Sequence, residues 1–133
     1  MEDVRDIESS AGVLEIAVAS TATIYTKAIS LTLGEYFALT YKATSDGAVK
    51  LQIQIEQSPV LPTTEGASDA NFVIPEGFSD VESALATETQ HIKKIEPICM
   101  KYMRLKITGL GAPLANAAST TIRLRLGKRD LGN

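Results

Sequence analysis

Tryptophan is absent from the chain, and aromatic residues make up only 5% of it. Sites that stack sugar rings or unpaired bases depend on exposed aromatic side chains. The scarcity therefore argues against a platform for either ligand. The formal net charge of -3, from 13 basic and 16 acidic residues, provides no overall field that attracts a phosphate backbone. We therefore expect no nucleic-acid partner.

Cysteine and histidine each occur once. A single cysteine cannot close an intrachain disulfide, and the apolar neighbours Ile98 and Met100 favour a buried thiol for Cys99 over a reactive one. His91 has no second histidine or cysteine with which to share a metal ion, and no serine in a nucleophile motif. We therefore expect no catalytic residue, no cofactor and no metal, and we predict that the protein is not an enzyme.

Long apolar runs are also missing. None approaches the ~18 to 20 residues that cross a bilayer, and the opening MEDVRDIESS is acidic and polar where a signal peptide is basic and then apolar. We therefore expect no membrane association. We also expect the protein to be synthesised in a reducing cytosol. The 133 residues fit one domain, with residues 1 to 11 as an N-terminal arm and 12 to 133 as the domain itself.

What the chain does have is alternation of apolar and polar residues. Near the end, Met103, Leu105 and Ile107 are expected on the buried face of a strand, with Arg104 and Lys106 on the wet face. Similar alternation runs through residues 13 to 19, 49 to 56 and 121 to 126. About seven to eight short strands without a long helical pattern predict an all-β fold, an antiparallel two-sheet β-sandwich. Asp46-Gly47 predicts a tight hairpin between two of the strands.

A long excursion, about residues 58 to 90, interrupts this pattern with prolines, glycines and polar residues. Irregular segments of this length are usually functional or disordered, and a short helix over 80 to 90 is compatible with the sequence. We expect the arm and the excursion to make the main contacts between subunits, with their apolar residues buried only on assembly. The candidate interaction residues in these two segments are Val4, Ile7, Leu61, Phe72, Ile74 and Phe78.

Other candidate sites have ordinary alternatives. The row Arg104, Lys106, Arg123 and Arg125, continued by Lys128 and Arg129, forms a basic stripe if the last two strands are neighbours; it is either a solvated face or a contact surface for an acidic protein. Gly109-Leu110-Gly111 is interpreted as a turn, because a phosphate-binding loop needs a third glycine and a following helix. The excursion carboxylates match no EF-hand spacing, so a solvated acidic loop is favoured over a calcium site; they are Glu65, Asp69, Glu76, Asp80, Glu82 and Glu88.

The ending YMRLKITGLGAPLANAASTTIRLRLGKRD resembles the close of small virion structural proteins of tailed bacteriophages. Tyr102, Arg104, Lys106 and Thr108-Gly109 match the first strand of that ending, and residues 121 to 126 match the last strand. The resemblance covers about half of the chain. It implies a jelly-roll-like sandwich that decorates or cements the outer surface of a capsid. Such a protein is a homo-oligomer, with a trimer preferred, that binds the major capsid protein or another virion protein.

The fold class alone is also compatible with a carbohydrate-binding β-sandwich module, which is the alternative function. The low aromatic content counts against it.

Overall fold

The computed structural model describes residues 4–30, 36–45, 49–85, 89–94, 100–111 and 119–128. These residues contain only strands and irregular segments, and no helix among them is long and apolar enough to cross a membrane. The strands, in chain order, are β1 (Val4–Ile7), β2 (Ile16–Ala19), β3 (Thr23–Tyr25), β4 (Ile29–Ser30), β5 (Tyr36–Ser45), β6 (Lys50–Ser58), β7 (Glu82–Leu85), β8 (His91–Lys94), β9 (Tyr102–Leu110) and β10 (Ser119–Lys128).

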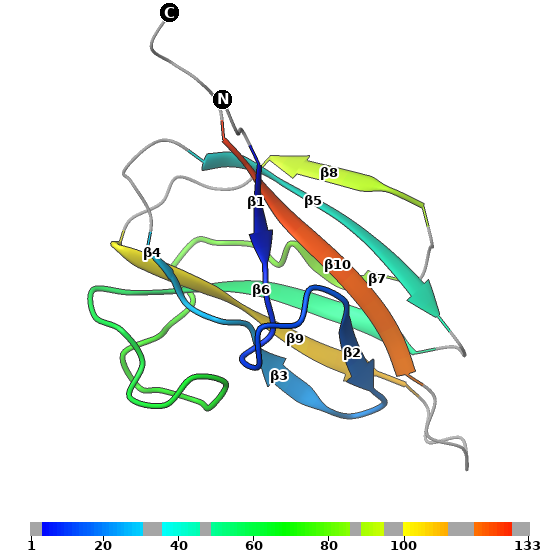
Figure 1. Ribbon diagram of the computed structural model, residues 1–133, viewed down its shortest axis with the longest axis horizontal. Helices are drawn as coiled ribbons and strands as arrows, with labels where there is room; N and C mark the ends of the chain where they lie inside the picture. Colours follow the sequence, from blue (N-terminus) through cyan, green and yellow to red (C-terminus); the bar gives the residue numbers. More distant parts are fainter. Residues whose placement is uncertain are drawn as a thin grey trace, which may run out of the picture.

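Two antiparallel five-stranded sheets pack face to face as a sandwich, which confirms the predicted fold class (Figure 1). The first, here called the β10 sheet, has the order β1-β10-β5-β8, and β2 pairs with the other end of β10. The second, the β9 sheet, has the order β3-β9-β6-β7, and β4 also pairs with β9. From β4 onward the chain changes sheet at every step except β6 to β7.

The predicted hairpin at Asp46-Gly47 is wrong. The flanking strands β5 and β6 belong to different sheets: β5 pairs with β10 and β8, and β6 pairs with β9 and β7. The dipeptide itself lies outside the described residues. A turn signal is local, whereas the partner of a strand is set by the long-range burial of its apolar face.

The core lies between the sheets and comes from the alternating residues. Apolar side chains of β5 and β10 face those of β6 and β9 with almost no exposure to solvent. The buried set includes Leu39, Tyr41, Leu51, Ile53, Ile55, Met103, Leu105, Ile107, Ile122, Leu124 and Leu126. The inward phase predicted for Met103, Leu105 and Ile107 is therefore confirmed, and the alternation predicted for residues 121 to 126 buries residues 122, 124 and 126.

The described part of the expected arm is a strand. Residues Val4–Ile7 pair with β10 in antiparallel register, and Ile7 is fully buried in the core. An arm was the wrong prediction, because a strand of four residues is too short to show an alternating pattern; its pairing with a strand about 120 residues away stabilises it. Residues 82 to 85 likewise form β7 against β6, so the compatible helix is absent there.

Gly109 is part of β9 rather than a turn. It lies against the segment that connects β2 to β3. The Gly109 N–H donates to the carbonyl of Ala22 at 2.8 Å, and the Gly109 carbonyl accepts the N–H of Thr21 at 3.2 Å. A Cβ at this position would lie 2.2 Å from the carbonyl oxygen of Ala19. Close approach of two backbones therefore explains this glycine.

Candidate interaction surfaces

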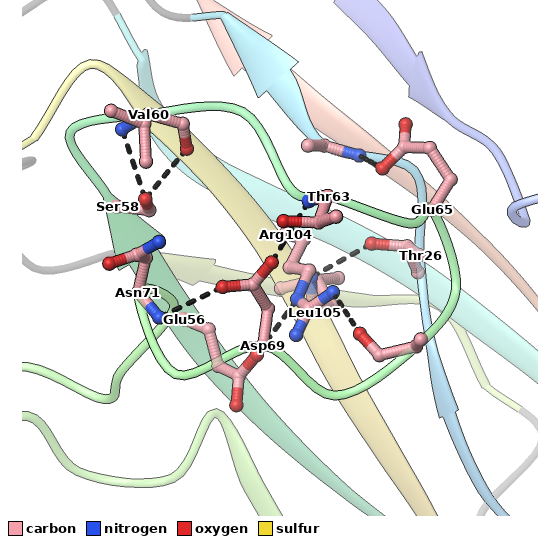
Figure 2. Close-up of polar contacts among 12 residues, drawn as sticks. Thr26, Glu56, Ser58, Val60, Thr63, Glu65, Asp69, Asn71, Arg104 and Leu105 are labelled. Atoms are coloured by element: carbon pink, nitrogen blue, oxygen red, sulfur yellow. Dashed lines mark hydrogen bonds and ion pairs between the residues drawn. The ribbon is translucent and has the colours of Figure 1, made fainter.

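Arg104 is buried beneath the excursion, with 1% of its surface exposed. Its Nε donates to Glu56 Oε1 at 2.9 Å, and its Nη1 donates to the Ala67 carbonyl at 2.7 Å (Figure 2). The guanidinium carbon lies 4.2 Å from the ring centroid of Tyr25 and 4.5 Å from that of Phe72. The predicted wet position was therefore wrong, because the excursion covers this face with the Ala67 carbonyl and the Phe72 ring, while Glu56 of β6 and Tyr25 of β3 supply the anion and the second ring.

Further contacts hold the excursion on the outer face of the β9 sheet. Gln52 and Gln54 of β6 donate to the two oxygens of Asp80 at 3.1 and 2.9 Å. Val73 makes an isolated bridge to Gln57. These two glutamines on the outer face of β6 thus bind their own chain. The excursion is a folded layer of the domain over this strand.

Asp69 holds together the part of the excursion between residues 63 and 71. Its carboxylate accepts the N–H groups of Thr63 at 3.0 Å and Asn71 at 2.9 Å (Figure 2). These two backbone donors, with a further contribution from the positive charge of Arg104, lower the pKa of Asp69 from its usual value. The carboxylate is therefore used as an internal turn-forming group.

The apolar candidates of the excursion divide into buried and exposed residues. Phe72 is buried against Arg104, and Phe78 packs against the main core. Ile74 is half-buried, and Leu61 is exposed. The expectation that these side chains wait for a partner is wrong for Phe72 and Phe78, because the excursion packs onto its own sandwich.

Four exposed apolar residues surround the end of β6, and we call them the loop patch: Val60, Leu61, Val73 and Met100. They are between 42% and 59% exposed. Hydrogen bonds connect three of them to Gln57 or Ser58: Gln57 Oε1 accepts the Met100 N–H at 3.1 Å, the Ser58 hydroxyl donates to the Val60 carbonyl at 2.6 Å, and the backbones of Val73 and Gln57 bond to each other; Leu61 follows Val60 in the chain. Leu61 was predicted as a contact residue. The other three were missed, because strand pairing and not sequence spacing brings residues 73 and 100 to this end.

The predicted basic stripe does not form. Arg104 and Lys106 lie on β9, whereas Arg123 and Arg125 lie on β10 in the opposite sheet. Arg129 lies outside the described residues. The stripe required the last two strands to be neighbours, and they belong to different sheets.

Arg123 and Arg125 instead line an open groove of about 280 Å³ on the outer face of the β10 sheet. We call it the β10 groove; its lining is Glu15, Thr40, Tyr41, Lys42, Thr44, Gln90, Arg123 and Arg125. Asp6 of β1 lies beside it, with its Oδ1 3.7 Å from Arg123 Nη2 and 3.2 Å from Arg125 Nε. Lys42, Thr40 and Asp6 were not predicted as site residues, because only the register of β1, β10 and β5 brings them together.

A third cluster joins the edges of the two sheets. The Tyr41 hydroxyl of β5 donates to Glu82 of β7, and the Tyr41 ring stacks on His91 of β8 with centroids 5.3 Å apart. Burial, the hydrogen bond to Glu82 and the charge of that carboxylate raise the pKa of Tyr41. These contacts connect β5 and β8 of one sheet to β7 of the other, so the cluster stabilises the packing of the two sheet edges.

The acidic residues of the excursion are dispersed. Glu65 accepts the Ala28 N–H at 3.3 Å, while Asp69, Asp80 and Glu82 bind the separate partners given above. No three histidine, cysteine, aspartate or glutamate side chains gather as metal ligands within the residues that the structure describes. Glu88 and Cys99 lie outside them, as does the side chain of Val4.

No protein-family model, no curated protein and no solved structure matches the chain.

Proposed function

We propose that the protein is a non-enzymatic virion structural protein that decorates or cements the outer surface of a capsid. The observation that carries the proposal is the loop patch. Isolated exposed apolar side chains are ordinary, but grouped ones on a rigid support are typical of protein contacts. The resemblance of the chain ending to small phage virion proteins points to the same role. Its place would be the capsid surface, after synthesis in the host cytoplasm.

The mechanism is mechanical. A decoration protein that contacts neighbouring shell subunits raises the free energy of their separation, because its binding energy is lost when they part. A homo-oligomer, preferably a trimer, presents several loop patches at once, and linked contacts bind with higher avidity than single ones. The major capsid protein or another virion protein is the proposed partner. The internally bonded excursion supports this role, since a preorganised contact surface loses little entropy on binding.

Carbohydrate binding is the alternative, and the aromatic side chains give it little support. Of those described, Tyr41 and Phe72 are buried, and Tyr25, Phe78 and Tyr102 are half-buried. Stacking against a sugar ring requires an exposed aromatic face.

Co-sedimentation with capsids that lack the protein tests the proposal. Val60 and Val13 are 47% and 50% exposed, and only Val60 belongs to the loop patch, so Val60→Asp and Val13→Asp form a matched pair. We expect the wild type and Val13→Asp to co-sediment, and Val60→Asp to bind at least about tenfold more weakly, the effect of losing one well-packed contact. Failure of the wild type to co-sediment at any salt concentration, or equal losses in both variants, would contradict the proposal.

A further inference from the structure

The β10 groove places like charges opposite each other. Arg123 of β10 and Lys42 of β5 are direct cross-strand partners, and Arg125 follows two residues along the same face. Like charges in directly opposed positions destabilise a sheet. Lys42 makes no ion pair with any residue in the described ranges, and Asp6 is the one carboxylate paired with both arginines there. Glu15, in the lining, is a second carboxylate, so three cations (Lys42, Arg123 and Arg125) stand against two carboxylates (Asp6 and Glu15), and the described groove keeps a net positive charge.

The arginines also retain donors for a ligand. Asp6 Oδ1 lies beyond hydrogen-bond distance from Arg123 Nη2, at 3.7 Å, so this ion pair leaves the terminal amino groups of Arg123 able to donate to a ligand, whereas the Nε is buried. Each guanidinium carries five N–H donors in a planar fork that fits a carboxylate. Both side chains are more than two-fifths exposed, at 41% and 44%. The hydroxyls of Thr40 and Thr44 add polar groups to the same lining.

The spacing of the cations selects the shape of the ligand. Residues two apart on a strand are separated by about 7 Å, the same as the separation of alternate residues in an extended peptide. Arg123 and Arg125 thus match two carboxylates at alternate positions, and Lys42 lies one strand away, at about 4.8 Å. We propose that the β10 groove binds an extended, acidic segment of a partner protein with Asp or Glu at alternate positions.

This inference goes beyond shell binding by the loop patch and does not rest on it. The two surfaces belong to different sheets, and the β10 groove is polar where the loop patch is apolar. An acidic oligosaccharide is less favoured, because the lining aromatic residue, Tyr41, is buried and offers no stacking face.

Titration of the isolated full-length protein, followed by amide chemical shifts, tests the inference without capsids. The probe is an eight-residue peptide of alternating Glu and Ser, and the control peptide replaces each Glu by Gln. We expect saturable shifts at Thr40, Lys42, Thr44 and Arg123 with the Glu peptide, weakening with added salt. The Gln peptide should give none.

Lys42→Glu and Lys106→Glu provide the matched variants, because both reverse one lysine on an outer strand face and only Lys42 lines the groove. We expect Lys42→Glu to weaken binding of the Glu peptide at least about tenfold, as for loss of one charge-assisted contact, and Lys106→Glu to change it less than twofold. Equal losses in the two variants, equal binding of the Gln peptide, or groove shifts with trigalacturonate or inorganic phosphate but not with the Glu peptide would each overturn the inference.

Discussion

At the scale of single residues, Arg104 has the least expected environment. An alternating strand predicts a solvated arginine, and the structure instead encloses it between Tyr25 and Phe72 with Glu56 as its counter-ion. Its Nη2 has no hydrogen-bond partner within the described part of the chain. Burial of an ion pair contributes little net stability, but removal of one partner leaves an uncompensated charge. The buried Arg104–Glu56 pair therefore favours the one conformation in which the excursion covers β9.

We predict that Arg104→Ala lowers the free energy of unfolding by about 3 to 5 kcal/mol, because it leaves the Glu56 carboxylate buried and unpaired. Urea denaturation followed by circular dichroism measures the loss. The double variant Glu56→Leu with Arg104→Met removes both charges and should recover most of the stability. A loss in Arg104→Ala as small as that of an exposed ion pair would show that the excursion opens readily to water.

Tyr41 predicts a dependence of stability on alkaline pH. Its pKa is raised in the folded state, so the folded chain keeps the phenol proton at pH values where the unfolded chain releases it. This contribution to stability is complete below about pH 10, the pKa of an unperturbed tyrosine, and is lost as the pH rises towards the folded value. We expect the urea midpoint to fall as the pH rises above about 10, that unperturbed value. Tyr41→Phe should flatten that fall, and an unchanged slope in this variant would contradict the assignment.

At the scale of elements, the turn from β2 to β3 and the end of β9 depend on each other through Gly109. The neighbouring backbone is held by two hydrogen bonds and cannot move aside cheaply. We predict that Gly109→Ala lowers the free energy of unfolding by about 1 to 3 kcal/mol, the usual effect of overpacking a tight contact. Gly12, which has open space around a Cβ position, is unsuitable as a control because its φ is positive. Gly127→Ala is the better control, since an added Cβ there meets Ala38 at an ordinary 3.6 Å. Equal losses in thermal unfolding for the two variants would argue against the close approach.

The strands themselves show how far the sequence predicts this fold. Alternation identifies the core-facing residues of β6, β9 and β10, because alternate side chains of these strands pack between the two sheets. It does not identify strand partners, so the hairpin and the basic stripe were wrong, and the loop patch and β10 groove were only partly foreseen. Arg104 escaped prediction for a related reason: the excursion that buries it is irregular and carries no period.

At the scale of the whole molecule, almost every strand pair joins distant parts of the chain. Among the strands that the structure describes, only β6 and β7 are both paired and consecutive, and the 59 to 81 segment separates them. Folds dominated by such non-local pairs close long loops before the contacts stabilise them, and they refold in milliseconds to seconds. β10 is the strand that completes this closure, since β1, β2 and β5 all pair with it.

We predict that a chain ending at residue 118 does not fold. Without β10, the paired edges of β1, β2 and β5 lose their hydrogen-bond partner, and the core loses Ile122, Leu124 and Leu126. Far-ultraviolet circular dichroism should show no cooperative thermal transition for this fragment. A synthetic peptide of residues 112 to 133 should restore the transition when added in excess, because the folded complex is stabilised by mass action. The same peptide with Leu124→Asp is the matched control and should not restore it, since the change puts an unpaired carboxylate into the core. A cooperative transition in the fragment alone would mean that the β9 sheet and the remaining β10-sheet strands form a stable unit without their central strand.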